Sequence, residues 1–202
     1  THKPRIRLAG WYIREKPIWK ICSEKLKKYD NYEVVISSWD SDKDYSRLSN
    51  FLSNNFSQMN VTLIRVYLNK KFSQSGGRYI AFQHSRGHIL SFVDSDMLFV
   101  RTIVIQRGLM YVRKDESYFP ICYSLDKEGS GWWRPTGYGN CFLSRQIMNN
   151  IGWIEKFSWE KEDACIHSHV VKSGIKVNRD NCAGWYRQWQ PLTLMKRIHL
   201  FM

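Results

Sequence analysis

The first half of the chain carries two hydrophobic periods in alternation. Strands are predicted over residues 6–13, 32–39, 61–68 and 89–93, where apolar residues alternate with polar ones or form short buried-type runs. Between them, apolar residues recur at three- and four-residue steps over residues 17–29, 45–56 and 76–86, which predicts helices. Strands that alternate with helices in this way indicate a mostly parallel sheet with helices on both faces.

The second half is less regular. Helices are predicted over residues 102–114, 146–151 and 159–173, the last ended by Gly174, and strands over residues 118–124, 140–144 and 175–177. Residues 126–139 are rich in Gly, Trp and Arg and are predicted to form a loop. Because no linker or repeat is apparent, we expect residues 1–202 to form a single α/β domain.

The fourth predicted strand ends in two carboxylates, Asp94 and Asp96. A buried strand can carry such charges only where it leaves the core. On an extended backbone the two side chains project to one side, with Ser95 opposite. Two hard oxygen ligands on one side suit Mn²⁺ or Mg²⁺, and a divalent ion there would suit a diphosphate. The alternative is a strand-end turn with two solvated acids.

Other chemistry-bearing residues lie at the ends of the first two predicted strands. Trp11, Tyr12 and Arg14 lie at the end of the first, and Asp40 follows the second. In parallel sheets, ligands collect at the carboxyl ends of the strands. These segments and the paired aspartates therefore predict a ligand site at one edge of the sheet. For Trp11 and Tyr12, ordinary packing is an equally weighted alternative.

Composition narrows the function classes. The 202 residues are 43% hydrophobic and 15% aromatic, with nine Trp and eleven Tyr, so we expect some aromatic surface to line a groove. The net charge of +13 implies an anionic partner, which is a nucleic acid, a membrane surface or a nucleotide-sugar phosphate. Lys and Arg are scattered, and no nucleic-acid-binding motif is present, so no nucleic-acid partner is predicted.

Cysteine usage and hydropathy bear on location. The five Cys are odd in number and form no Cys-x-x-Cys pair, which fits a reducing compartment better than a disulfide framework. No apolar run approaches the roughly 20 residues that span a bilayer, so no stable membrane insertion is expected. The predicted location is the cytoplasm.

Three segments together resemble nucleotide-sugar glycosyltransferases with a GT-A fold, of the family-2 and galactosaminyltransferase type. Residues 40–42 are similar to that group's uracil-reading turn, and residues 74–96 to its Gly-rich helix leading into an Asp-x-Asp strand. Residues 139–144, followed by 159–163, resemble the acceptor-side segment that ends in Trp-x-x-Glu-Asp. The segments occur in the family's order over roughly residues 5–177. Compact size also suits the soluble glycosyltransferases of chlorella viruses, which would place the chain in host cytoplasm.

The resemblance implies metal-dependent transfer of a hexose or deoxyhexose from a UDP-sugar to a glycan or glycoprotein acceptor. Residues 1–100 would bind the nucleotide and residues 101–202 the acceptor. Asp96 would be the direct ligand of Mn²⁺ or Mg²⁺, with Asp94 and the late His199 as further ligands. The implied contacts to the nucleotide sugar come from Gly10, Trp11, Tyr12, Asp40, Arg78, Asp94 and Ser95.

The resemblance also assigns the acceptor side. Asp163 would be the general base that removes the acceptor's proton, with Glu162 hydrogen-bonding a sugar; the reverse assignment remains open. In a retaining enzyme Asp163 need not be a base. Without the resemblance, the alternative is a Glu/Asp pair that stabilises the first turn of a helix through the helix dipole. The acceptor platform would comprise Trp132, Trp133, Tyr138 and Trp159.

Three other functions remain as alternatives. A sugar-phosphate nucleotidyltransferase uses a similar sheet, but it would normally have a Gly-rich first loop with Arg and Lys, unlike residues 9–12. A basic nucleic-acid-binding module would show steep salt dependence. A glycan-binding protein that has lost catalysis would not hydrolyse a donor.

His167 and His169 lie two apart on a predicted helix and are interpreted as surface or packing residues.

Overall fold

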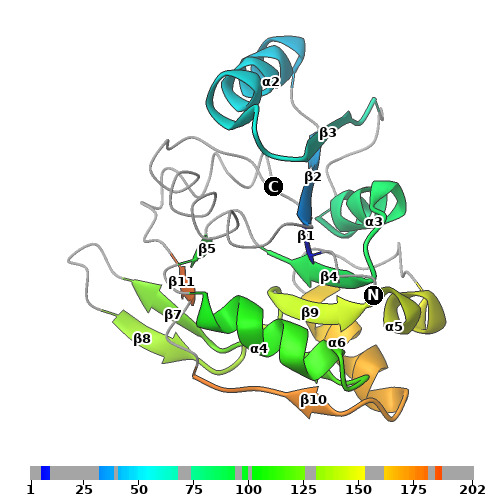
Figure 1. The fold of residues 1–202 in the computed structure, drawn as a ribbon. Helices are drawn as coiled ribbons and strands as arrows, with labels where there is room; N and C mark the ends of the chain where they lie inside the picture. The colour runs from blue at the N-terminus through cyan, green and yellow to red at the C-terminus, as the bar shows by residue number, and fades with distance from the viewer. Residues whose placement is uncertain are drawn as a thin grey trace.

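The computed structural model describes residues 6–9, 32–38, 41–67, 74–93, 97–99, 102–125, 131–152, 162–181 and 185–187. Within these ranges the chain forms a large mixed sheet, a smaller second sheet and helices that cover the large sheet (Figure 1). The α/β architecture predicted from the hydrophobic periods is confirmed.

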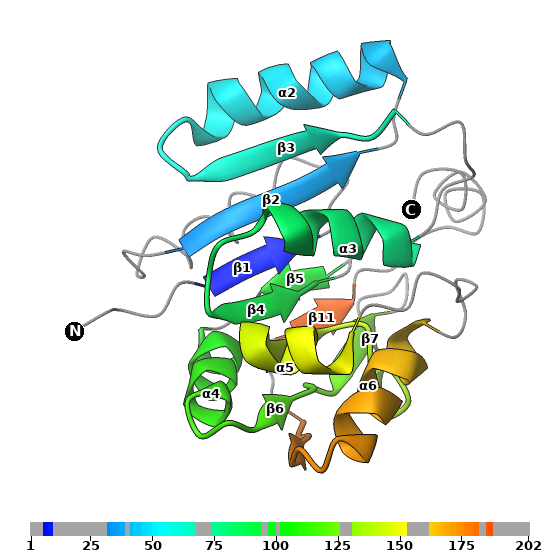
Figure 2. The ribbon, with the colours of Figure 1, turned by 90° about the vertical axis from the view of Figure 1, so that its right-hand side faces the viewer.

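The large sheet has seven strands among the described residues. In spatial order they are β10 (Val177–Asn178), β6 (Ser117–Tyr118), β9 (Cys141–Ser144), β4 (Ile89–Phe92), β1 (Ile6–Ala9), β2 (Tyr32–Ser38) and β3 (Val61–Arg65). Strands β4, β1, β2 and β3 are mutually parallel, so their carboxyl ends lie along one edge (Figure 2). Strand β9 runs antiparallel to both β4 and β6.

The helices cover both faces of this sheet (Figures 1 and 2). Their bounds are α2 (Asp42–Phe56), α3 (Gln74–His84), α4 (Ile103–Val112), α5 (Arg145–Ile151) and α6 (Glu162–Lys172). Strand β2 shows how the faces are divided, because Val34 and Ile36 join a core with α2 and α4, whereas Val35 joins a core with α3, α5 and α6. Successive strand residues point to opposite faces, so one continuous apolar run supplies both cores.

The second sheet contains four strands within the described ranges. Its order is β5 (Met97–Phe99), β11 (Trp185–Arg187), β7 (Cys122–Leu125) and β8 (Gly131–Arg134). Strand β11 is antiparallel to β5 and parallel to β7, and β7 forms an antiparallel hairpin with β8. The sheet therefore joins the strand that follows the paired aspartates to the predicted acceptor-side segment.

Local signals explain where several elements begin and end. The Ser41 side chain caps α2 by accepting a hydrogen bond from the Asp44 backbone N–H at 3.3 Å, and Ser144 caps α5 by accepting one from the Ile147 N–H at 3.0 Å. Gly174 has φ +73°, the left-handed conformation that ends α6 as predicted. No helix in the described part of the chain combines the length and apolar character that a bilayer crossing requires.

Two local predictions are wrong. The single strand expected over residues 118–124 is two strands, β6 and β7, in different sheets, and Pro120 lies between them. Proline has no N–H to donate to a ladder, so the chain leaves one sheet there and enters the other. The loop expected over residues 126–139 contains strand β8. The helix predicted over residues 17–29 lies outside the described residues.

Candidate active site

The predicted ligand edge is formed by the carboxyl ends of four parallel strands. The register pairs Ala9, the last residue of β1, with Val35 of β2 and with Phe92, the last residue of β4. It also pairs Ser38 with Arg65, the last residues of β2 and β3. The four strands therefore end along the same edge of the sheet, where ligands of parallel sheets collect.

Most of the predicted donor-side residues follow these strand ends directly. Residues 10–12 come after β1, and residues 94–96 come after β4 and the buried Val93. Asp40 follows β2 by two positions. The side chains themselves lie outside the described residues, as does His199, so their contacts stay predictions. Those outside are Gly10, Trp11, Tyr12, Asp40, Asp94, Ser95, Asp96, Trp159 and His199.

Helix α3 begins at this same edge. The Ser37 hydroxyl, near the end of β2, donates to the Gly77 carbonyl oxygen in the first turn of α3 at 2.9 Å. The next residue, Arg78, is buried, and its Nη2 donates to the Gly139 carbonyl oxygen at 3.0 Å. Arg78, predicted to contact the nucleotide sugar, therefore lies beside the strand ends and links α3 to the segment that leads into β9.

The start of β9 lies next to the end of β4, because Cys141 pairs with Phe92. Just before it, Asn140 is buried, and its Nδ2 donates to the Cys122 Sγ at 3.6 Å. This hydrogen bond joins the start of β9 to β7 of the second sheet. The donor-side edge and the predicted acceptor-side segment are thus held together by buried polar contacts.

The two adjacent tryptophans of β8 have different surroundings. Trp133 pairs with Tyr123 of β7, and their ring centroids are 5.2 Å apart in an edge-to-face arrangement. Trp132 points to the other face of the strand and is 58% exposed. An exposed indole offers an apolar face on which a sugar ring can stack. Of the two predicted platform residues, Trp132 is therefore the more exposed.

Tyr138 and His167 form an aromatic contact on the acceptor side. Their ring centroids are 4.2 Å apart, and the His167 ring also meets Phe119 at 5.2 Å. The Arg179 guanidinium lies over the Tyr138 ring at 4.2 Å. Burial lowers the pKa of His167, and the nearby Arg179 charge lowers it further. His167 is therefore a packing residue, as predicted.

Helix α6 begins at Glu162, so Glu162 and Asp163 occupy its first turn. Their side chains lie outside the described residues. A carboxylate in this position can interact with the helix dipole, act as a base, or do both. The assignment of Asp163 as base and Glu162 as its partner stays a prediction.

A metal centre would depend on residues outside the described ranges. Within those ranges, no group of three or more His, Cys, Asp and Glu side chains is arranged to hold a metal ion. The predicted ligands are two carboxylates with one imidazole, and such an oxygen-rich set suits Mn²⁺ or Mg²⁺ chemically. The donor types therefore fit the expected ion.

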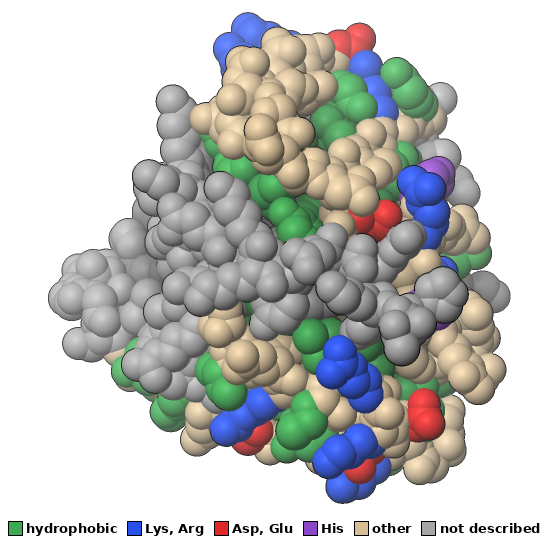
Figure 3. Space-filling view, in the orientation of Figure 1, with side chains coloured by type: hydrophobic (Ala, Val, Ile, Leu, Met, Phe, Trp, Pro, Cys, Tyr) green, Lys and Arg blue, Asp and Glu red, His purple; other side chains and the backbone are tan. Residues whose placement is uncertain are grey.

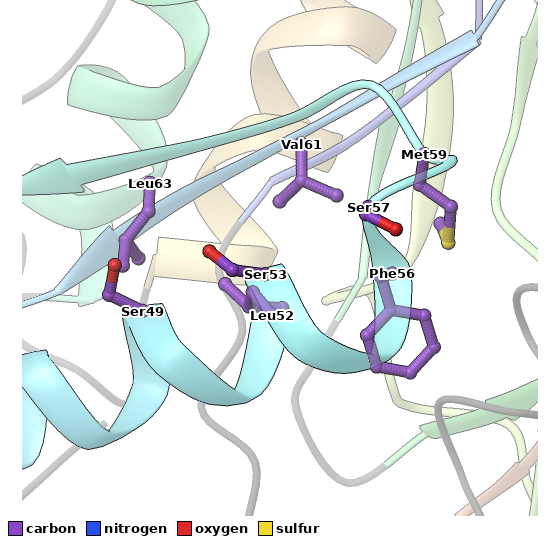
Figure 4. Close-up of a pocket in the computed structure, with 8 residues that line it drawn as sticks. All are labelled: Ser49, Leu52, Ser53, Phe56, Ser57, Met59, Val61 and Leu63. Atoms are coloured by element: carbon purple, nitrogen blue, oxygen red, sulfur yellow. The ribbon is translucent and has the colours of Figure 1, made fainter.

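A cavity of about 270 Å³ lies between α2 and β3 (Figure 4). Its lining includes Ser53 and Phe56 of α2 and Val61 and Leu63 of β3. Because β3 runs from Val61 toward the ligand edge at Arg65, the cavity lies along the amino-terminal part of the strand. None of the predicted site residues lines it.

Charge on the described surface is dispersed. Lys and Arg side chains are scattered over the face in Figure 3, several of them beside acidic side chains. Ion pairs in the structure include Lys176 with Glu116, at 3.0 Å, and Arg107 with Asp180. This arrangement agrees with the interpretation that much of the net charge is solvated surface.

Sequence reasoning missed Arg179, whose guanidinium contacts Tyr138 and donates to two backbone carbonyls. It lies between β10 and β11, in a segment with no motif. No sequence signal identifies it, because many surface arginines also lie just after a predicted strand.

Comparisons with solved structures agree with this architecture. A mannosyltransferase from Pyrobaculum calidifontis, solved with GDP-Man and Mn²⁺, superposes with a TM-score of 0.66 at 12% identity over 92% of this chain and 57% of that one. TarS 1–349 of S. aureus gives 0.67 at 13% identity over 92% and 60%. GalNAc-T7 with UDP, GalNAc and Mn²⁺ gives 0.65 at 11% identity over 93% and 44%.

At these identities the similarity establishes the fold alone, and the chain spans about half of the length of these structures. No curated protein sequence matches the chain significantly. The sequence model described as Glycosyl transferase family 2 matches residues 12–172, which is most of the chain. The chain therefore belongs to glycosyl transferase family 2 and is a glycosyltransferase domain with a GT-A fold.

Proposed function

We propose that this domain transfers a hexosyl or deoxyhexosyl group from a UDP-sugar to a glycan or glycoprotein acceptor. One observation carries the proposal: in a family 2 domain, the Asp-x-Asp segment directly follows β4, whose carboxyl end lies beside those of β1, β2 and β3. Ligands of open α/β sheets bind at such an edge.

On the donor side, the base would be held by residues that follow β1 and β2. Gly10, Trp11 and Tyr12 would surround the uracil, and the Asp40 carboxylate would accept its ring N–H. Arg78 and Ser95 would contact the ribose or phosphates. GalNAc-T7 was solved with UDP, whereas the mannosyltransferase was solved with GDP-Man. The choice of UDP therefore rests on the resemblance of residues 40–42, which lead into α2, to the family's uracil-reading segment.

Asp96 and Asp94, with His199, would hold Mn²⁺ or Mg²⁺. When bound, the ion would neutralise charge that develops on the leaving diphosphate. Oxygen donors suit both ions, and two of the similar structures contain Mn²⁺. Arg78 adds a fixed cation beside the same strand ends, which supports stabilisation of an anion there.

On the acceptor side, Asp163 would take the proton of the attacking hydroxyl, and Glu162 would orient a sugar. This assignment applies to an inverting reaction; with retention of configuration, Asp163 need not act as a base. The acceptor platform would comprise Trp132, Trp133, Tyr138 and Trp159, and the 58% exposure of Trp132 leaves its ring open to a sugar. An aromatic surface beside a carboxylate is a suitable arrangement for binding and deprotonating a sugar hydroxyl.

We also propose that residues 1–202 act as one domain in a reducing, cytoplasmic setting. The five Cys are odd in number and form no Cys-x-x-Cys pair, a pattern that fits a reducing compartment better than a disulfide framework. Disulfide frameworks are rare in the reducing cytosol, so this cysteine usage supports the location.

A thermal-shift series tests the proposal. UDP-glucose, UDP-galactose, UDP-N-acetylglucosamine, UDP-N-acetylgalactosamine and GDP-mannose would each be added with Mn²⁺ or with EDTA. We expect at least one UDP-sugar to raise Tm with Mn²⁺ only, because a ligand at 100 times its Kd stabilises the folded state by about 2.7 kcal/mol. A preference for GDP-mannose would contradict the UDP assignment. No Mn²⁺-dependent shift with any donor would contradict the proposed function.

A further inference from the structure

Arg179 cross-links the acceptor side of the domain. It follows β10, and its Nη2 donates to the carbonyl oxygens of Pro135 at 2.7 Å and Gly137 at 3.2 Å. Both carbonyls belong to the connection between β8 and β9. That connection begins immediately after β8, which carries the exposed Trp132. One side-chain nitrogen therefore fixes two points of the segment that follows the tryptophans.

The same guanidinium reaches α6 through two aromatic rings. It lies 4.2 Å from the Tyr138 ring centroid, and the Tyr138 ring lies 4.2 Å from that of His167, inclined at 34°. His167 is four residues after Asp163, one helical turn along α6. The contacts thus run without a gap from the β8–β9 connection to the helix whose first turn contains Glu162 and Asp163.

The backbone on either side of Arg179 is fixed. The Phe119 N–H donates to the Asn178 carbonyl oxygen at 2.9 Å, and the Ile121 N–H donates to that of Asp180 at 3.0 Å. The Asp180 carboxylate also accepts from the Tyr118 hydroxyl at 2.8 Å and pairs with Arg107. Arg179 is therefore presented from a rigid base, which a side chain needs if it is to hold a loop in position.

Holding Arg179 in this place has a cost. Burial lowers the pKa of the guanidinium, which means that the charged form is disfavoured there. Its Nη1 is buried and has no hydrogen-bond partner among the described residues. A buried donor without an acceptor destabilises the folded protein, so a gain in stability does not explain why an arginine lies here.

We propose that Arg179 is a positioning residue that fixes the β8–β9 connection, and with it Trp132, relative to the first turn of α6. The inference rests on the proposed function, because it assigns the acceptor side to these two elements. Arginine suits the role because a planar guanidinium can donate to two carbonyls while it stacks on Tyr138; a lysine ammonium can donate but cannot stack in the same way.

Four proteins test the inference: wild type, Arg179→Ala, Arg179→Lys and Arg145→Met. The last removes a partly buried arginine of α5 with contacts of the same kind, because Arg145 donates to the Gly87 carbonyl oxygen and the Ser85 hydroxyl and lies over the Phe82 ring. It therefore controls for general destabilisation. Hydrogen exchange of the amides of residues 131–138 is the first readout. We expect faster exchange there in Arg179→Ala, an intermediate rate in Arg179→Lys, and no selective change in Arg145→Met.

Kinetics supply the second readout, with a panel of p-nitrophenyl hexosides as acceptor probes. We expect Arg179→Ala to lower kcat/KM for an accepted hexoside by about 10²-fold, since small misplacements cost about that much. Arg179→Lys should recover part of the loss. Calorimetric affinity for UDP with Mn²⁺ should remain at the wild-type value, because Arg179 lies on the acceptor side.

Unchanged exchange of residues 131–138 in Arg179→Ala overturns the inference, as does a loss of UDP affinity equal to the loss of kcat/KM. Should Arg179→Ala fail to fold, Arg179→Lys decides by the same exchange measurement. If wild type itself binds no UDP with Mn²⁺, the proposed function fails, and the exchange result still reports whether Arg179 holds the connection.

Discussion

Arg78 is only 3% exposed, and its Nη2 donates a 3.0 Å hydrogen bond to the carbonyl oxygen of Gly139. The bond joins α3, which precedes the Asp-x-Asp strand, to the segment that leads into β9. Since the first residue of β9 pairs with the last residue of β4, this buried cation lies where the donor-side and acceptor-side halves meet. Arg78 therefore has a structural task in addition to the nucleotide contact proposed for it.

Replacing Arg78 with Met should destabilise the fold. The substitution keeps an unbranched stem but removes every donor, which leaves the buried Gly139 carbonyl without this partner. We expect the free energy of unfolding in urea to fall by about 1–3 kcal/mol. Arg86→Met is the matched control, since the Arg86 side chain is exposed, and it should change stability by less than about 0.5 kcal/mol. Equal losses in the two variants would contradict a special role for Arg78.

Gly108 should not tolerate alanine. In an ordinary helix this change stabilises by about 1 kcal/mol, but a Cβ at Gly108 would overlap the ring of Phe142, which is fully buried in β9. Overpacking of this kind typically costs about 1–3 kcal/mol. Gly137→Ala is the control, because a Cβ there meets nothing within 4 Å. A Tm for Gly108→Ala at or above the wild-type value would show that α4 moves away from the sheet without cost.

The two tryptophans of β8 should separate binding from stability. Trp132→Ala removes an exposed ring, so Tm should change little, while KM for an accepted hexoside should rise by about tenfold, equivalent to ~1.4 kcal/mol. Trp133→Ala removes the edge-to-face contact with Tyr123, worth about 0.5–1.5 kcal/mol beyond the loss of burial, and should lower Tm. A larger loss of stability in Trp132→Ala than in Trp133→Ala would reverse the assignment.

His167 should make stability depend on pH on the acidic side. Its pKa in the folded protein is lowered, first by burial and then by the Arg179 charge, so the unfolded chain binds a proton more readily than the folded one. Stability should therefore fall as pH decreases from above the ordinary histidine value of about 6.5 until it passes the folded pKa. Tm measured against pH should lose part of this slope in His167→Gln, and His169→Gln serves as the same-helix control. An unchanged slope in His167→Gln would contradict the assignment.

Much of the fold was predictable because its large elements follow clear periods. The run at residues 32–39 became β2, with Val34 and Ile36 facing one core and Val35 the other. The last predicted helix ends just before Gly174, because glycine readily adopts the left-handed conformation that follows a helix end. These are local rules, and the sequence within about ten residues is enough to apply them.

The second sheet was not predictable by those rules. Strand β5 has three residues and pairs with β11, which is far away in the chain and equally short. Segments of that length show no measurable period, and their pairing is a tertiary effect. Trp132 and Trp133 were identified as chemistry-bearing residues, but their opposite orientations followed only from the strand that contains them.

The position of the candidate site could be predicted from the sequence, but the contacts of its side chains could not. The topology brings the ends of β1, β2 and β4 to one edge, as the order of the segments predicted. The individual side chains that follow those ends lie outside the described residues, so Asp40, Asp94 and Asp96 remain predictions. Arg179 could not have been found from sequence, because its significance depends on contacts with residues 135–138 and α6.

Calorimetric titration of UDP into the protein with Mn²⁺, for wild type, Asp96→Asn and Asp115→Asn, tests the central claim most directly. Asp115 is an exposed residue of the turn after α4 with φ +58°, a conformation that Asn accepts, so it controls for the loss of one carboxylate. The account predicts Mn²⁺-dependent binding in wild type and Asp115→Asn. In Asp96→Asn it predicts that the affinity for UDP in the presence of Mn²⁺ falls by at least about tenfold. Mutation of residues that only support a metal ligand already costs about that much. Equal affinity in all three proteins, or wild-type binding that is indifferent to Mn²⁺, would contradict it.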